Sequence, residues 1–421
     1  MFKKSYWKLS LLWLVIAVFA AACGGRDDTP ALPTRVDLGA ISASGTETAQ
    51  PTSTNTRIGP TLPPSWTPAP QVSAATATPN VVLASATATA IPASGTIYYL
   101  YNGDSIAAVD VASTESRLIA TFGVGVPITG LTLSPDQRLL AYVAPGNGSA
   151  REVFVSSLDG TYQQQISCLG FADVRAPAWS ADSASLAFIG GQAPNSPLNI
   201  YVANFAGSGT CPSGNNQRLV ASVDSTFLSE VVWDPNGTRL FFSNNELYAV
   251  DLANGSISPA LTQTRGFGSD FDLSFNPMNN QLTYLRAERN LTTGAEGGLA
   301  FQLDVTSTAQ LAPAQTLPAT LASHVEWSRD GRYFLASEAD SVYIFDAQEQ
   351  NVQTLLSGLV VPPNAIFSPD AALIAYLAVD PVNPSLQQIF VLDRAAETMR
   401  QITFITEGAI STLQWAVTPP S

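Results

Sequence analysis

The 421-residue sequence contains few of the side chains on which metal sites and hydrolytic enzymes usually depend. It has one histidine, His324, and three cysteines. No Cys-x-x-Cys pair is present, so the spacing of a zinc site is missing. No Gly-x-Ser-x-Gly motif is present either, and a serine-based triad would need His324 beside a nucleophile. We therefore expect no metal, no cofactor and no catalytic residue, and we interpret His324 as an ordinary turn or surface histidine.

Positive charge is also scarce. Lys and Arg together number 19 against 33 Asp and Glu, and the net charge is −14. Nucleic acids and anionic lipid headgroups are bound by clusters of basic side chains, and no such cluster follows the first residues. The composition therefore disfavours nucleic acid as a partner, and the acidic excess is typical of an exported, soluble surface.

The first residues resemble a bacterial lipoprotein leader. Lys3, Lys4 and Lys8 precede a short apolar stretch, and small residues at 20–22 precede Cys23. We predict a signal peptide over 1–22 and acylation of Cys23, which would hold the protein at a membrane. Two alternatives stay open, because Ala20 replaces the more usual Leu: a secreted protein in which Cys23 is incidental, and an uncleaved anchor.

A long segment of low complexity follows the predicted leader. Residues 23–95 carry the lipidated Cys23 and then a stretch rich in Thr, Pro, Ala and Ser. Such a composition cannot bury enough apolar surface to offset the cost of ordering the chain. We predict a disordered linker that holds the following domain away from the membrane. Glycosylation of this linker is left open.

One short pattern then recurs seven times. Each copy has an apolar or aromatic anchor, and in most copies a turn such as Ser-Pro-Asp and a short apolar stretch follow it. Successive anchors lie 40 to 54 residues apart. A period of this length, made of strands and turns, is the signature of a β-propeller. The anchors are Leu133, Trp179, Trp233, Phe275, Trp327, Phe367 and Trp415.

The two ends of the repeat region complement each other. Residues 96–101 resemble a second strand that has no first strand before it, whereas 412–417 resemble a first strand that has no second strand after it. Pairing the two ends would complete one blade. We therefore predict an all-β, seven-bladed propeller over 96–418, closed by both ends of the chain.

The recurring aspartates are interpreted as turn formers. Asp110, Asp251, Asp304, Asp346 and Asp393 each follow an apolar strand pattern. An aspartate at such a position caps backbone amides of the turn that it begins.

Three other carboxylates could face the centre of the propeller. Asp270, Asp272 and Glu326 lie near the starts of innermost strands, where Ca²⁺ sites in propellers would need clustered carboxylates. We weigh this as the minor alternative to a purely structural role.

Cys168 and Cys211 could form a disulfide, because exported proteins live where disulfides persist. In a simple meander, however, the two positions would fall on opposite faces of the disc. The long connection over 204–216 would have to fold over to join them, so the sequence leaves the pairing open.

The repeat resembles the TolB-type β-propeller repeat, also called the PD40 or WD40-like repeat. The resemblance rests on Trp/Phe-Ser-Pro-Asp, then Leu-Ala-Tyr/Phe, then Ile-Tyr-Val/Leu-x-Asp, and it covers 96–418. It implies the fold but carries no functional residue. The chain lacks the α/β domain that precedes the propeller in TolB, and it has its own predicted anchor.

These observations favour a membrane-tethered, extracytoplasmic scaffold of the cell envelope that binds a protein or peptide as a monomer. The alternative is a secreted enzyme or solute binder with a metal or sugar in the central channel. A spacer without a specific ligand is the third possibility. Partner contacts are expected in three predicted inserts, after Gly190, over 205–217 and over 287–298.

Overall fold

The computed structural model describes residues 95–123, 125–146, 148, 150–204, 217–260, 270–289, 296–304, 314–315, 322–348 and 351–417. The regular elements in these ranges are all β-strands. No helix in them is long and apolar enough to cross a bilayer. The predicted leader, Cys23, the linker up to residue 94 and Cys211 lie outside the described residues.

The strands form four-stranded antiparallel sheets. One sheet joins both ends of the described chain, in the order β28 (Ile410–Ala416), β1 (Thr96–Tyr101), β2 (Ser105–Asp110) and β3 (Ser116–Thr121). The next contains β4 (Thr129–Leu133), β5 (Leu139–Pro145), β6 (Arg151–Ser157) and β7 (Gln163–Gln165). The third contains β8 (Asp173–Trp179), β9 (Ser185–Gly191), β10 (Leu198–Asn204) and β11 (Gln217–Val223).

The remaining sheets repeat this order. They contain β12 (Val231–Trp233), β13 (Arg239–Asn244), β14 (Glu246–Asp251) and β15 (Ile257–Pro259), and then β16 (Asp270–Phe275), β17 (Gln281–Arg289), β18 (Glu296–Asp304) and β19 (Ala314–Gln315). Next come β20 (His324–Trp327), β21 (Tyr333–Ser337), β22 (Val342–Asp346) and β23 (Asn351–Leu356). The last sheet has β24 (Ile366–Phe367), β25 (Leu373–Val379), β26 (Gln387–Asp393) and β27 (Thr398–Gln401).

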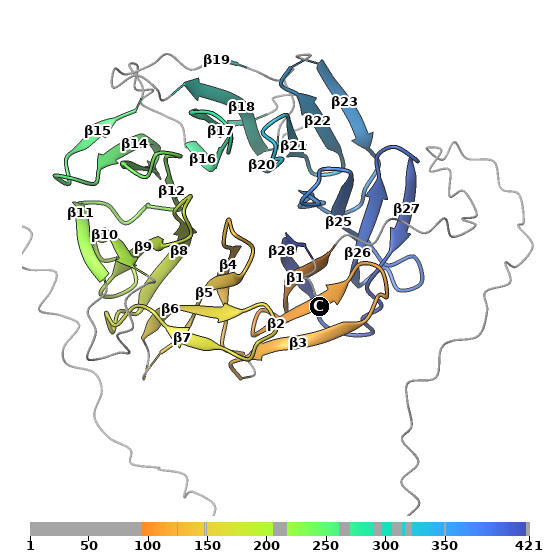
Figure 1. The fold of residues 1–421 in the computed structure, drawn as a ribbon, viewed down its shortest axis with the longest axis horizontal. Helices are drawn as coiled ribbons and strands as arrows, with labels where there is room; N and C mark the ends of the chain where they lie inside the picture. Colours follow the sequence, from red (N-terminus) through yellow and green to blue (C-terminus); the bar gives the residue numbers. More distant parts are fainter. Residues whose placement is uncertain are drawn as a thin grey trace, which may run out of the picture. The chain divides into compact units, whose positions relative to one another are not determined.

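The sheets surround a common centre, and the fold is an all-β propeller (Figure 1). The first strand of each sheet is innermost and contacts the innermost strands of both neighbouring sheets. This chain of contacts returns to its start, because β28 contacts both β4 and β24. The predicted pairing of the two ends is present, with Ile97 opposite Trp415 in the β1–β28 ladder.

The apolar core is divided into one cluster between each pair of adjacent sheets. Each cluster combines side chains from two neighbouring sheets and includes one of the seven anchors. Trp415, for example, packs with Ile97 of its own sheet and with Ile389 of the preceding sheet. An anchor of this size fills the gap between two sheets that would otherwise be hydrated.

Three anchor tryptophans also bond to the preceding sheet. The indole Nε1 of Trp233 donates to the carbonyl of Ala178 at 3.0 Å, and that of Trp179 donates to the carbonyl of Thr132 at 3.4 Å. In Trp327 the indole donates to Thr283 Oγ1 at 3.0 Å. A buried indole N–H needs an acceptor, so each bond fixes the spacing of two sheets.

The turn after each anchor is held by its own side chains. The Ser368 hydroxyl donates to Asp370 at 2.6 Å and accepts the amide of Leu373 at 2.9 Å. Ser134, Ser180 and Ser328 form the same pair of bonds with the aspartate two residues on and the amide five residues on. These bonds explain why Ser-x-Asp recurs in the sequence.

Most of the aspartates that follow third strands act as turn formers. The carboxylate of Asp393 accepts the amides of Ala395 and Ala396, both at 2.9 Å. Equivalent bonds to backbone amides two or three residues on are made by Asp110, Asp251 and Asp346. The side chain of Asp304 lies outside the described residues.

Two of the predicted inserts are shorter in the structure than the sequence indicates, and the insert over 287–298 is wrong in part. Residues 287–289 and 296–298 are not loop, because they extend the β17–β18 ladder, in which Ala287 pairs with Gly298 and Arg289 with Glu296. The insert after Gly190 reduces to a connection over 192–197, since β9 continues to Gly191. Residues 205–216 and 290–295 lie outside the described residues.

We predict that Trp415→Ala lowers the free energy of unfolding by about 3–5 kcal/mol, because it opens a cavity at the sheet that joins both ends. Trp415 is 4% exposed, whereas Val417, two residues on, is 46% exposed. Val417→Ala is the matched control and should change stability by less than about 0.5 kcal/mol. Urea denaturation measures both. Equal effects of the two substitutions would contradict this account of the closure.

Candidate binding face and central channel

Two positions on or just before each innermost strand line the centre of the propeller. Two cavities of about 540 and 560 Å³ lie there, and both are lined by Thr132, Asp272 and Gln414. We call this space the central channel. The residues three positions before the anchors line it, namely Gly130, Ala176, Glu230, Asp272, His324, Asn364 and Thr412. The residues one position before the anchors also line it, namely Thr132, Ala178, Val232, Ser274, Glu326, Ile366 and Gln414.

A backbone irregularity recurs at the first of these positions. Gly130, Ala176, Asp272, Asn364 and Thr412 have positive φ angles, between 41° and 66°. The ladders of β4, β8 and β16 with their second strands shift register across this point. Such a bulge turns a side chain away from the ordinary alternation of a strand. The two channel-lining positions are two residues apart, so strand alternation already places both side chains on one side. The bulge changes the pairing of the strand between them in β4, β8 and β16.

The ionisable residues of the channel lie on three consecutive sheets, at Glu230, Asp272, His324 and Glu326. Their carboxylates bond to the backbone of the next sheet. Glu230 Oε2 accepts the amide of Leu273 at 3.0 Å, and Glu326 Oε2 accepts the amide of Phe367 at 3.2 Å. Asp272 accepts the amide of Val325 in the same way. Each carboxyl oxygen accepts an amide across a sheet boundary, so these side chains tie four sheets together in sequence.

Gln414 makes an equivalent hydrogen bond between sheets with an uncharged side chain. Its Oε1 accepts the amide of Leu133 at 3.0 Å, which joins β28 to β4. An amide side chain is thus sufficient for this role.

His324 is not the turn or surface histidine that we expected from the sequence. It begins β20, lines the channel, and its Nδ1 lies 3.1 Å from Asp272 Oδ1. Burial lowers the pKa of His324, but the charge and hydrogen bond of Asp272 outweigh burial, with smaller effects of Glu326 and Glu230, and raise the pKa to about 9. At neutral pH the imidazolium Nδ1–H therefore donates to Asp272.

The pKa values of Glu230 and Glu326 are raised, which favours the neutral carboxylic acids. Burial is the main cause for Glu230, followed by the charge of Asp272, and its pKa rises to about 7. Burial also raises the pKa of Glu326 to about 7, partly opposed by His324 and the Phe367 amide. Glu230 Oε1 is buried and has no hydrogen-bond partner among the described residues, which also favours protonation.

The predicted channel carboxylates divide into two groups. Asp272 and Glu326 line the channel. The expectation for Asp270 is wrong, because its carboxylate is buried against the Arg286 guanidinium at 2.7 and 2.9 Å. We did not predict Glu230. Counting three residues back from Trp233 reaches Glu230, the position equivalent to Asp272 before Phe275.

The connections between strands define two faces. The entry face is formed by the connections that lead into innermost strands and by those that join second to third strands. The turn face is formed by the connections that join first to second strands and third to fourth strands. The described entry-face connections lie within 102–104, 122–128, 146–150, 166–172, 192–197, 224–230, 338–341, 357–365, 380–386 and 402–409, with residues 245, 260 and 322–323.

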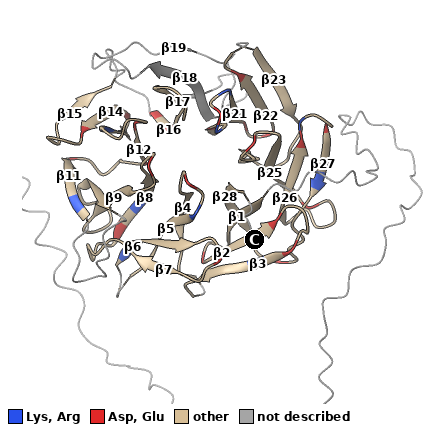
Figure 2. Ribbon diagram, in the orientation of Figure 1, with Lys and Arg blue, Asp and Glu red and all other residues tan. Residues whose placement is uncertain are grey.

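Charge is distributed unequally between these faces. Figure 2 marks the acidic and basic residues along the ribbon. The described entry-face connections contain no Lys or Arg. Their carboxylates are Asp104, Asp224, Glu230, Glu338, Asp340, Asp380 and Glu407. The described turn-face connections also contain carboxylates, but there they are accompanied by Arg138, Arg329, Arg332 and Arg394. Glu230 and Asp380 are engaged within the structure, and the other five entry-face carboxylates are at least partly exposed, so the entry face presents an acidic surface without basic side chains in its described connections.

The entry face also exposes large apolar side chains. Phe227, Val360, Val382 and Phe404 have exposed fractions of 69%, 83%, 77% and 65%. They are at most four residues from the end of a strand, on well-defined connections. The turn-face segments expose Tyr162, Met278 and Val417 by 40%, 71% and 46%, so the entry face holds the more exposed set. Exposed apolar side chains that gather on one face mark interaction sites more often than scattered ones do.

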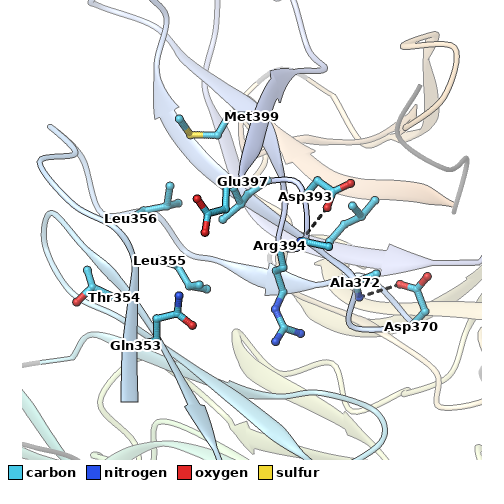
Figure 3. Close-up of a pocket in the computed structure, with 13 residues that line it drawn as sticks. Gln353, Thr354, Leu355, Leu356, Asp370, Ala372, Asp393, Arg394, Glu397 and Met399 are labelled. Carbon is cyan, nitrogen blue, oxygen red and sulfur yellow. Dashed lines mark hydrogen bonds between the residues drawn. The ribbon is translucent and has the colours of Figure 1, made fainter. Parts of the chain in front are cut away.

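A third cavity lies outside the channel. It has a volume of about 820 Å³ and is lined by β23, β27 and the two turns at 370–372 and 393–397 (Figure 3). Most of its polar groups are committed to the fold. Asp370 and Asp393 accept amides of their own turns, and Arg394 donates to the Ala371 carbonyl at 2.6 Å. This groove is therefore explained as a gap between two well-capped turns.

The cysteines are only partly placed. Cys168 is disulfide-bonded, and its amide donates to Gln217 Oε1 at 3.2 Å. Gln217 directly follows the undescribed connection over 205–216. Because Cys211 lies in that connection, its pairing with Cys168 stays a prediction. Acylation of Cys23 likewise stays a prediction.

No family model matches the sequence, and no curated protein matches it. Matching solved structures include TolB from Acinetobacter baumannii, with 14% identity over 76% of this chain and 66% of that chain and a TM-score of 0.46. An oligogalacturonate lyase from Vibrio parahaemolyticus matches with 11% identity over 72% and 92% and a TM-score of 0.53. An oligogalacturonate lyase in complex with manganese matches with 14% identity over 68% and 82% and a TM-score of 0.52. The likenesses to the two oligogalacturonate lyases concern the fold, which is a β-propeller.

We predict an NMR titration of His324 with a pKa of about 9. It is the only histidine in the chain, so a protein without a histidine tag gives one imidazole signal. Asp272→Asn should move the pKa well below 9, because burial then opposes protonation with less compensation. Asp224→Asn, also on the entry face, is the control and should leave the titration unchanged. A wild-type pKa near 6.5 would contradict the pairing.

We also predict that stability falls as pH rises through neutrality. The folded pKa values of Glu230 and Glu326, about 7, exceed the ordinary value of 4.5. Their stabilising contribution is therefore fully present below pH 4.5 and is lost as pH rises through 7. The double substitution Glu230→Gln/Glu326→Gln should reduce the loss of unfolding free energy between pH 5 and 8.

The converse substitution provides the control for this pH dependence. Gln414→Glu places a carboxyl group at a site that already ties two sheets with an amide, so it should enlarge the loss between pH 5 and 8. Urea denaturation at several pH values measures all three proteins. An identical pH dependence in the wild type and the double glutamine variant would show that the two glutamates are not responsible.

Proposed function

We propose that this protein is an extracytoplasmic, membrane-tethered scaffold that binds another protein through the entry face of its propeller. The observation that carries the proposal is the composition of that face: it combines exposed apolar side chains with carboxylates and has no Lys or Arg in its described connections. Apolar contacts supply affinity in protein interfaces, and charges of one sign select the partner.

The channel side chains support a scaffold more than a reaction centre. Glu230, Asp272 and Glu326 each accept a backbone amide of the adjacent sheet, so their bonds serve the ring itself. The described residues contain no group of three or more His, Cys, Asp or Glu side chains arranged to hold a metal ion. The sites that vary freely in a propeller are the connections, and this argues for binding there.

The finer architecture is part of the proposal. We infer seven blades, with the blade of β28 and β1 closing the ring, because the pairing of these two strands completes a four-stranded sheet. The leader over 1–22 and Cys23 support a lipid anchor, and the composition of the segment that follows supports a linker of about 70 residues. Such a linker would span roughly 45–50 Å as a flexible coil.

A second candidate function is the binding of a small solute in the central channel. It is favoured by Glu230 Oε1, which is buried in the channel wall without a hydrogen-bond partner among the described residues. A cationic or hydrogen-bond-donating solute would suit this sector. In that case Glu230→Gln would weaken binding while substitutions on the exposed connections would not.

The first candidate predicts that an envelope protein is captured by the full-length protein and that capture depends on the entry face. Asp224→Asn/Glu407→Gln should weaken capture about threefold to tenfold at low salt, because complementary charges at the rim of an interface raise association rates. Quantitative mass spectrometry of affinity-captured envelope extract measures this.

The matched control neutralises two exposed glutamates of the turn face, in Glu115→Gln/Glu397→Gln, and should capture as much as the wild type. Cys23→Ala should move the protein out of the membrane fraction without weakening capture, which separates the tether from the binding surface. Failure of the folded wild type to capture any envelope protein, or equal losses in both double variants, would overturn the proposed function.

A further inference from the structure

Three of the exposed apolar side chains lie on connections of a single sheet, the one that contains β24 to β27. Figure 1 shows where β25, β26 and β27 of this sheet lie. Val360 lies on the connection into β24, Val382 on the connection between β25 and β26, and Phe404 on the connection that leaves β27. All three connections belong to the entry face. We call these three side chains the apolar patch.

A buried polar network lies beneath two of the three. Gln388 is fully buried, and its amide group is saturated with hydrogen bonds. Its Nε2 donates to Asp380 Oδ2 at 2.7 Å and to the Ile405 carbonyl at 2.8 Å. Its Oε1 accepts the Thr403 hydroxyl at 2.9 Å and the Ile405 amide at 3.1 Å. The network therefore joins the connection of Val382 to the connection of Phe404.

Asp380 completes the support on its own side. Its Oδ1 accepts the amide of Val382 at 2.7 Å and the amide of Asn383 at 3.0 Å. Thr403 Oγ1 also accepts the amide of Ile389, which anchors the other connection to β26. Both connections are thus fixed at the residues that immediately precede or follow the exposed apolar side chains.

The buried network of Gln388 and Asp380 holds two connections whose apolar side chains are exposed. Burying a glutamine and a carboxylate is unfavourable unless each polar atom is satisfied. The network satisfies them, yet the side chains that it positions, Val382 and Phe404, point their apolar surface to water. Exposed apolar side chains on rigid connections lose little conformational freedom on binding, which is the property of a preorganised interface.

Carboxylates surround the patch. Glu407 follows Phe404 on the same connection, Glu338 and Asp340 lie on the entry-face connection of the preceding sheet, and Asp104 lies on that of the following sheet. The Ala409 amide donates to Asn102 Oδ1 at 3.0 Å, so the connections that carry Glu407 and Asp104 are in contact. The described connections around the patch contain no basic side chain.

We propose that the apolar patch of Val360, Val382 and Phe404 is the docking surface for a protein segment whose apolar side chains are flanked by Lys or Arg. This inference rests on the proposed function and specifies which part of the entry face binds and what chemistry it binds. Charge complementarity decides the occupant, because flanking cations would meet Glu407, Glu338, Asp340 and Asp104.

Other occupants fit the charges less well. A second copy of this chain meeting the patch by two-fold symmetry would bring the same carboxylates against one another. An anionic membrane surface would be repelled by them as well.

Defined peptides test the proposal. Three fluorescently labelled peptides share a Leu-x-x-Phe core and differ in flanking residues, which are Lys, Ser or Glu. Fluorescence anisotropy with the full-length protein should show the tightest binding for the Lys-flanked peptide and the weakest for the Glu-flanked one. The Val382→Ser/Phe404→Ser variant should weaken binding of the Lys-flanked peptide about tenfold, as expected for loss of an interface anchor.

Met278→Ser is the matched control, because Met278 is 71% exposed but belongs to the turn face. It should bind the Lys-flanked peptide as the wild type does. The proposal is overturned if the Lys-flanked peptide does not bind, if the Glu-flanked peptide binds equally well, or if the patch variant binds like the control. It is also overturned if sedimentation shows that the wild type dimerises and the patch variant does not.

The outcomes also separate this inference from the proposed function. If the patch variant still captures the same envelope protein as the wild type, the scaffold function stands and the patch is not its docking surface. If the wild type captures nothing, the scaffold function itself fails. All substituted side chains are exposed, so circular dichroism and urea denaturation should show an unchanged fold.

Discussion

The packing of each sheet against both of its neighbours is the constraint on which the whole structure depends. A four-stranded sheet with two apolar faces cannot leave either face in water, and here each face contributes to a cluster shared with an adjacent sheet. The anchors fill these clusters, and the indoles of Trp179, Trp233 and Trp327 bond across them. Closing the ring through β28 and β1 removes the last unpaired face, so the chain ends contribute to the core instead of fraying from it.

The same constraint explains the ionisable side chains in the channel. The innermost strands are close together, and their amides need acceptors from the neighbouring sheet. Glu230, Asp272 and Glu326 supply them in one sector, while Gln414 supplies one in another. His324 offsets part of the negative charge that this arrangement gathers. These bonds stabilise the ring itself. The proposed binding function therefore rests on the entry face, which combines carboxylates with exposed apolar side chains.

The strands, the anchors and the pairing of the two ends could be predicted because each leaves a regular signal. The strand pattern around Trp415 has no second strand after it, and the pattern of residues 96–101 has no first strand before it. These two incomplete patterns predict that the chain ends pair. The channel positions of His324 and Glu230 could not be predicted, because the repeat pattern does not show which residues before an anchor face the centre. The place of Asp270 could not be predicted either, because the bulge at Asp272 shifts the pairing of β16 with β17. Asp270 was assigned to the channel, whereas the ladder register places it beside Arg286. The Gln388 network has no sequence signal, since its partners lie in three separate segments.

We propose that a partner protein meets the entry face and not the channel or the turn face. Hydrogen–deuterium exchange of the full-length protein, alone and with its captured partner, tests this most directly, because amides covered by a partner exchange more slowly. We expect protection in the connections at 380–386 and 402–409, whereas amides in the turns at 276–280 and 394–397 should keep their exchange rates. Protection confined to those turns, or to the channel-lining strands β12, β16 and β20, would contradict it.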